Sequence, residues 1–119
     1  MGLVSRLNVV YLYVRDLERS LAFYRDLLGI PLEGDDDWVE ATFPGGVRFA
    51  LHAWHPEAGE IGSGTVNVNL EVADLSRAVE RLRAAGVEVR EIERELWGSA
   101  CQVVDPDGYR IHLFQPPAG

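Results

Sequence analysis

Polar side chains that could bind an ion or a small molecule alternate with aliphatic ones along the segment TVNVNLEV, residues 65–72. Successive side chains of an extended strand point to opposite faces, so Asn67, Asn69 and Glu71 share one face. The four aliphatic side chains of the segment share the other face, which must be buried. Amide and carboxylate oxygens can hydrogen-bond a ligand, coordinate a hard cation or face water. The segment alone leaves these three interpretations open.

An internal repeat indicates how this strand is positioned. The segment VRDLERSLAFYRDLLGI, residues 14–30, resembles VADLSRAVERLRAAGV, residues 72–87. The third residue of each is an aspartate suited to cap a helix, Asp16 or Asp74, and apolar residues at helical spacing follow it. Gly29 and Gly86 are suited to end the two helices. The sequence therefore predicts one amphipathic helix in each half.

Strand patterns surround both predicted helices. A strand precedes each helix, over residues 7–14 and 65–72, and three strands follow it. In the first half these cover residues near 31–32, 38–43 and 47–54, and in the second half residues near 87–90, 99–104 and 109–115. The sequence predicts an α+β fold of two β-α-β-β-β modules. We expect a single domain over residues 1–119, with modules at 5–54 and 65–116 and a linker at 55–64.

Composition excludes several classes of protein. The 119 residues carry a net charge of −8, so the basic footprint of a nucleic-acid-binding protein is missing. No apolar run approaches the roughly 20 residues that span a bilayer, and the N-terminal residues lack a secretory signal pattern. The single cysteine, Cys101, excludes an internal disulfide and a cysteine-based zinc site. We therefore expect a cytoplasmic protein without nucleic-acid or membrane partners.

The order of the motifs, with VRDLERSLAFYRDLLGI near the start and DPDGYRIHLFQ near the end, resembles the vicinal oxygen chelate superfamily. This superfamily includes glyoxalase I, extradiol dioxygenases, fosfomycin-resistance enzymes and bleomycin-binding resistance proteins, and the resemblance covers nearly the whole chain. It implies a curved mixed sheet with helices on its convex face and a pocket on its concave face. It also implies a homodimer. Because one fold can host many chemistries, the function must be argued from the site residues.

Strand alternation assigns side chains to that concave face, and a shift of one residue would reverse every assignment. Aromatic walls with a few polar groups are typical of small-molecule pockets, and flat rings stack on Tyr and Trp. A face open to solvent or used as a dimer contact is the alternative. The residues expected to bind a small-molecule ligand are Tyr11, Tyr13, Trp38, Arg48, His52, Asn67, Asn69, Glu71, Arg110, His112 and Phe114.

The resemblance also implies where a metal would bind. Enzymes of the superfamily generally hold a divalent ion at four strand positions, which here are Val9, Ala50, Asn67 and His112. Valine and alanine carry no donor atom, whereas zinc-type sites usually need three or more ligands from His, Cys, Asp or Glu. We therefore expect neither a metal nor another cofactor. A displaced site that includes His52 is the alternative, and strand spacing predicts that Glu71 is too far from His112 to join it.

Three functions are compatible with the sequence. The first is a non-catalytic protein that sequesters an aromatic small molecule, for example a cationic antibiotic. The second is a metal-independent enzyme in which His112 transfers a proton, because imidazole titrates near neutral pH, while Glu71 or Arg110 orients the substrate. The third is a metal-dependent lyase, isomerase or dioxygenase with rearranged ligands around His112. A catalytic role is thus expected of His112 first and Glu71 second, and only if the protein is an enzyme.

Overall fold

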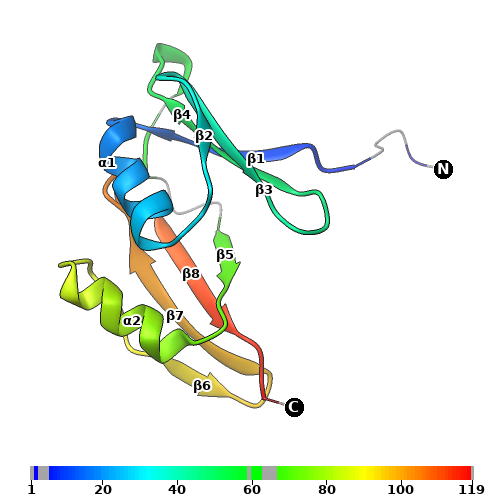
Figure 1. Cartoon of the computed structure of the whole chain (residues 1–119), viewed down its shortest axis with the longest axis vertical. Helices are drawn as coiled ribbons and strands as arrows, with labels where there is room; N and C mark the ends of the chain where they lie inside the picture. Colours follow the sequence, from blue (N-terminus) through cyan, green and yellow to red (C-terminus); the bar gives the residue numbers. More distant parts are fainter. Residues whose placement is uncertain (1, 3–5, 59, 63–66, 119) are drawn as a thin grey trace. The chain divides into compact units, whose positions relative to one another are not determined.

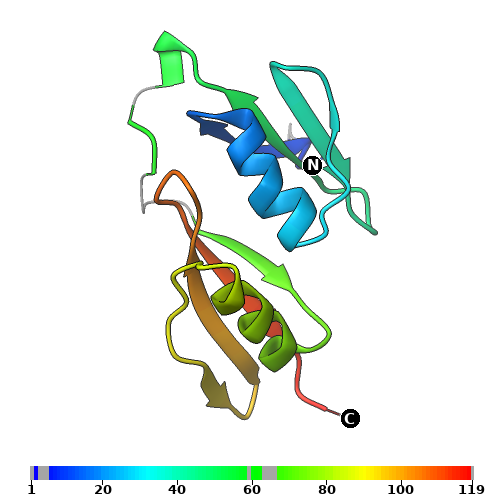
Figure 2. The ribbon, with the colours of Figure 1, turned by 60° about the vertical axis from the view of Figure 1, so that its left-hand side comes forward.

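The computed structural model describes residues 2, 6–58, 60–62 and 67–118. The chain forms two compact units, Met1–Ile61 and Gly62–Gly119. Each unit has a four-stranded mixed sheet with a helix on one face, as Figures 1 and 2 show. This arrangement confirms the predicted α+β fold of two β-α-β-β-β modules. In the described part of the chain, no helix is both long and apolar enough to cross a lipid bilayer.

The first unit has the strand order β1-β4-β3-β2. Strands β1 and β4 are parallel, and the other neighbouring strands are antiparallel. The helix consists of an α-helical segment followed directly by a π-helical one. The elements are β1 (Val9–Val14), α1 (Leu17–Leu21), η1 (Ala22–Leu27), β2 (Glu33–Gly34), β3 (Trp38–Thr42), β4 (Arg48–Ala53) and the 3-10 helix η2 (Pro56–Ala58).

The second unit repeats this topology with the strand order β5-β8-β7-β6. Strands β5 and β8 are parallel, and β8 and β6 each pair antiparallel with β7. The elements are β5 (Val68–Glu71), α2 (Leu75–Ala84), β6 (Glu93–Glu95), β7 (Gly98–Val104) and β8 (Arg110–Gln115). Residues 63–66, which include the end of the predicted linker and the first two residues of the predicted strand at 65–72, lie outside the described residues.

Both predicted helix caps are present. The Asp16 carboxylate accepts a hydrogen bond from the Arg19 amide at 3.2 Å, and Asp74 accepts one from the Arg77 amide at 3.1 Å. The first helix differs from the prediction in its second half, where the Leu28 amide donates to the Phe23 carbonyl, five residues back. This π-helical segment contains Tyr24, which is completely buried.

The two short strands lie further along the chain than predicted. In the first unit the predicted strand at residues 31–32 is wrong. The Ile30 amide donates to the Tyr24 carbonyl at the end of the helix, and the Leu32 amide donates to the Ile30 carbonyl in a tight turn. Strand β2 forms immediately afterwards. In the second unit the predicted strand at 87–90 is reduced to one bridge between Val89 and Val103, and β6 begins at Glu93.

Strand alternation separates a buried face from a polar face in both sheets. The fully or nearly fully buried strand residues facing the helices are Leu12, Val14, Val39, Ala41, Phe49 and Leu51 in the first unit and Cys101, Val103, Ile111 and Leu113 in the second. The strand predicted over residues 47–54 would bury Val47 on the same face as Phe49, and this is wrong, because Val47 precedes β4 and is 43% exposed. The opposite faces carry the residues predicted to bind a ligand.

Candidate functional site

Aromatic side chains gather on the polar face of the first sheet. The strand register places Tyr13, His52 and Trp38 in one row across β1, β4 and β3, and Tyr11 lies in the next row. The His52 ring stacks on Tyr13, with ring centroids 4.9 Å apart. The Trp38 ring centroid lies 5.2 Å from that of Tyr11 and 5.6 Å from that of His52. These four residues are called the aromatic cluster.

The aromatic cluster is partly exposed to solvent. Tyr11 is 43% exposed, which is high for a large ring in the middle of a strand. The His52 side chain is 24% exposed, but its Nδ1 atom is buried and makes no hydrogen bond among the described residues. The Asp37 Oδ1 atom lies 3.9 Å from this nitrogen, so a protonated His52 would form an ion pair with Asp37.

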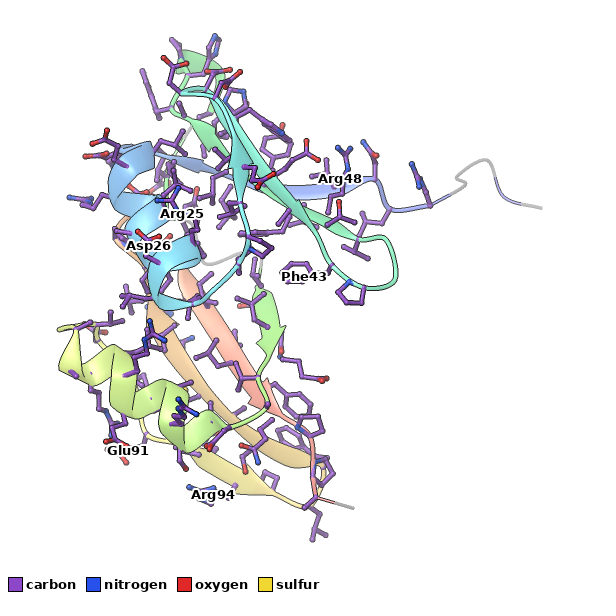
Figure 3. The ribbon with its side chains drawn as sticks, in the orientation of Figure 1. Arg25, Asp26, Phe43, Arg48, Glu91 and Arg94 are labelled. Carbon is purple, nitrogen blue, oxygen red and sulfur yellow. The ribbon has the colours of Figure 1, made fainter. Side chains whose placement is uncertain are left out.

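A hydrogen-bond network fixes the Trp38 end of the aromatic cluster. The Trp38 Nε1–H group donates to Glu40 Oε1 at 2.9 Å, and Arg48 Nη1 donates to Glu40 Oε2 at 2.9 Å. Arg48, labelled in Figure 3, also donates from Nη2 to Asn8 Oδ1 at 2.8 Å. The hydrogen bond from Trp38, and then that from Arg48, holds the pKa of the Glu40 carboxyl below its ordinary value of 4.5. The network keeps the indole in one orientation.

This lowered pKa predicts a pH-dependent contribution of Glu40 to stability. Because the pKa of Glu40 is lower in the folded chain than in the unfolded one, its contribution is complete above pH 4.5 and is lost as the pH falls through the folded value. We expect wild type to be more stable than Glu40→Gln at pH 7, and this difference to disappear as the pH is lowered below 4.5. Urea unfolding at a series of pH values measures the difference in free energy of unfolding between the two proteins. A difference that stays constant down to pH 2 would contradict the lowered pKa of Glu40. Glu80→Gln, on the exposed face of α2, controls for the loss of one charge.

The polar face of the second sheet carries amide and imidazole groups. The register places Asn69 opposite His112 and His112 opposite Gln102, so these three form a row across β5, β8 and β7. Glu71 and Phe114 are paired in the next row. Two further predicted residues are exposed: Asn67, which directly precedes β5, and Arg110, which begins β8. This face resembles the first in register but has fewer rings.

Trp97, which was not among the predicted site residues, forms a second aromatic contact. Its ring stacks on Phe114, with centroids 6.1 Å apart and an interplanar angle of 16°. Trp97 is 60% exposed and lies in the turn between β6 and β7. The following Gly98 has a φ of +138°, and a Cβ atom there would lie 2.5 Å from the Phe114 ring. The Trp-Gly pair at the start of a strand is the sequence signal for this contact.

The structure groups the predicted ligand-binding residues by unit. The first unit brings the aromatic cluster together, with Arg48 tied to it through Glu40. The second unit brings Asn69, His112, Glu71 and Phe114 onto neighbouring rows. That these residues contact a ligand stays a prediction.

The residues at the implied metal positions do not fit a zinc-type metal. Ala50 is completely buried opposite Tyr11, and neither Ala50 nor Val9 has a donor atom. The remaining two positions supply one amide, Asn67, and one imidazole, His112, which is fewer than the three or more protein ligands that such sites use. Among the described residues, no group of three or more His, Cys, Asp and Glu side chains is arranged to hold a metal.

The register brings Glu71 closer to His112 than the strand spacing predicted, and whether the two share a ligand stays a prediction. The predicted spacing assumed that Asn67 would lie closest to His112, but the register places Asn69 there. Glu71 is therefore only one row away, at about 7 Å along the strand. A water molecule or a ligand group could connect a carboxylate and an imidazole at that separation.

Comparison with known proteins gives three findings. The family model "Glyoxalase/Bleomycin resistance protein/Dioxygenase superfamily" matches residues 6–113. The lactoylglutathione lyase of Neisseria meningitidis serogroup A is 33% identical, over 96% of this chain and 93% of that protein. The crystal structure of TnmS3, an antibiotic binding protein from Streptomyces sp. CB03234, matches with a TM-score of 0.79 and 27% identity, over 98% of this chain and 100% of that one.

Proposed function

The chain belongs to the glyoxalase/bleomycin resistance protein/dioxygenase superfamily, and we propose that it binds a flat aromatic small molecule and releases it unchanged. The observation that carries this proposal is the aromatic cluster. On a single sheet face the Tyr13 and His52 rings are stacked, the Trp38 ring contacts Tyr11 and His52 at steeper angles, and Tyr11 is 43% exposed. A planar ligand could cover this surface by stacking.

The hydrogen bonds behind the aromatic cluster favour tight binding. Glu40 holds the Trp38 indole from one side and the Arg48 guanidinium from the other. A ring already fixed in its bound orientation loses little conformational entropy when a ligand arrives. The binding surface of the cluster is therefore preorganised, and the ligand does not have to order it.

Charge favours a cationic ligand over a neutral one of the same shape. The chain has a net charge of −8, which attracts cations over a distance. Beside the aromatic cluster, the Asp37 side chain is 70% exposed. Aromatic faces attract cations through their quadrupole. Together these features support a planar cationic aromatic compound as the ligand class, and the antibiotic-binding character of TnmS3 is consistent with it.

The side chains at the implied metal positions support a function that does not depend on a metal. Val9 and Ala50 supply no donor atoms, and Asn67 and His112 alone give too few ligands for a zinc-type centre. No step of the proposed function requires a metal ion.

Two planar tricyclic probes test the proposal: proflavine, which is cationic, and acridone, which is neutral. We expect saturable fluorescence titrations with one strong site per chain, and tighter binding of proflavine. Mass spectrometry after prolonged incubation should recover both probes unchanged. Chemical conversion of a bound probe would contradict sequestration, and absence of saturable binding to either probe would contradict the ligand class.

A lyase is the second candidate, because a lactoylglutathione lyase is 33% identical over 96% of the chain. Incubation with lactoylglutathione, with and without added Ni²⁺ or Zn²⁺, tests it through the amount of intact thioester. Under the primary proposal the thioester is not consumed. If it is consumed, His112→Ala and His52→Ala distinguish the two imidazoles, since His52 Nδ1 lies beside Asp37 whereas His112 lies beside Asn69 and Gln102.

A further inference from the structure

A pocket of about 490 Å³ lies in the first unit, where β1 and β4 end. Its described lining consists of Arg15, Trp54, Glu60 and Ile61. This volume is within the usual range of small-molecule sites. None of these residues belongs to the aromatic cluster, although Arg15 and Trp54 each lie two residues along the chain from one of its members, Tyr13 and His52.

The end of the parallel strand pair positions the pocket. The Trp54 amide donates to the Val14 carbonyl at 2.9 Å, which extends the ladder between β1 and β4 by one residue. Arg15 directly follows β1, and Trp54 directly follows β4. One wall of the pocket is therefore anchored to the sheet through backbone hydrogen bonding. The Trp54 side chain is nevertheless 52% exposed, which leaves its ring available for stacking.

The polar groups of the lining select the charge of a ligand. Arg15 supplies a cation and Glu60 an anion, so their formal charges cancel. An anionic ligand would gain from Arg15 and be repelled by Glu60, and a cationic ligand would experience the reverse. A neutral ligand with a donor and an acceptor can satisfy both side chains. Arg15 also has a partner within the protein, but a guanidinium has five N–H donors and can serve a ligand as well.

We propose that this pocket binds a flat, uncharged ring in which an N–H group lies beside a C=O group, as in a lactam. The ring stacks on Trp54, the carbonyl oxygen accepts from Arg15, and the N–H group donates to Glu60. Ile61 provides an apolar contact at the edge of the ring. This inference assigns a second binding site and does not rest on the function proposed for the aromatic cluster.

Titration with 2-quinolone, followed through the indole N–H signals of the three tryptophans in ¹⁵N-labelled protein, tests the proposal. Trp54→Phe identifies the Trp54 signal. We expect that signal to shift in a saturable manner, and 2-quinolone to bind several-fold more tightly than the anionic quinoline-2-carboxylate. A stationary Trp54 signal, or equal affinity for the anion, would overturn the proposal.

Two variants separate the roles of the charged side chains. Arg15→Met keeps the aliphatic stem and should weaken 2-quinolone binding about tenfold, the effect of losing one hydrogen bond to a charged group. Glu60→Gln should strengthen binding of quinoline-2-carboxylate several-fold, because the repelling charge is removed. Glu80→Gln on α2 removes an equal charge outside the pocket and should leave both affinities unchanged. If Glu60→Gln and Glu80→Gln behave alike, the pocket does not recognise charge as proposed.

Discussion

Replacement of Trp38 by alanine is expected to weaken proflavine binding roughly thirtyfold or more, the loss typical of a central tryptophan in a binding surface. The indole lies 5.2 Å from the Tyr11 ring and 5.6 Å from the His52 ring, so its removal takes away the ring that contacts both. Glu40 also loses the hydrogen bond from Trp38 Nε1. Fluorescence titration of wild type and variant under identical salt conditions measures the change in Kd.

Trp38→Phe is the matched control for this change. It retains a ring for stacking but cannot donate to Glu40, so we expect a loss of only a few fold. Urea unfolding of both variants establishes that they are folded at the titration temperature. Wild-type affinity in a folded Trp38→Ala protein would show that the aromatic cluster is not the binding surface.

Replacement of Gly98 by alanine is expected to lower the free energy of unfolding by about 2–4 kcal/mol, the range of overpacking and strained-backbone substitutions. A Cβ atom at this position would lie 2.5 Å from the Phe114 ring and 2.7 Å from the Gln115 carbonyl oxygen. The φ of +138° is also unfavourable for alanine. Phe114 would have to move away from Trp97, so we further expect a red shift in tryptophan fluorescence. Urea unfolding monitored by circular dichroism measures the stability.

Gly45→Ala separates the two causes. Gly45 has a φ of +98°, but a Cβ atom there would meet no heavy atom within 4 Å. We therefore expect a loss of about 1–2 kcal/mol from backbone strain alone. Equal losses at Gly45 and Gly98 would show that contact with Phe114 contributes nothing.

Strand alternation was enough to predict both faces of each sheet. Asn69 and Glu71 lie on the polar face of the second sheet because every second residue of a strand points the same way, and this period needs no tertiary information. The N-caps at Asp16 and Asp74 were predictable for a similar reason, since the capping side chain bonds an amide only three residues ahead. Features that depend only on residues close together in the sequence were therefore predicted correctly.

Register and side-chain pairing were harder to predict, because they depend on neighbours distant in the sequence. Which residue lies opposite His112 follows from the pairing of β5 with β8, and the sequence favoured Asn67 where the structure has Asn69. The contact of Asp37 with His52 joins a loop to a strand, and the Asp-rich loop gave no sign of it. Strand patterns also could not show that Trp54 lines a pocket with Arg15 and Glu60.

The burial of Cys101 has a practical consequence for labelling the protein. The side chain is only 4% exposed, and burial raises the pKa of its thiol, with Arg83 partly opposing the shift. A protonated, inaccessible thiol reacts slowly with maleimides and with oxidants. Because it is the one cysteine of the chain, a cysteine introduced at the surface would be modified almost exclusively. Fluorophores or spin labels can therefore be attached to the native sequence background without first removing Cys101.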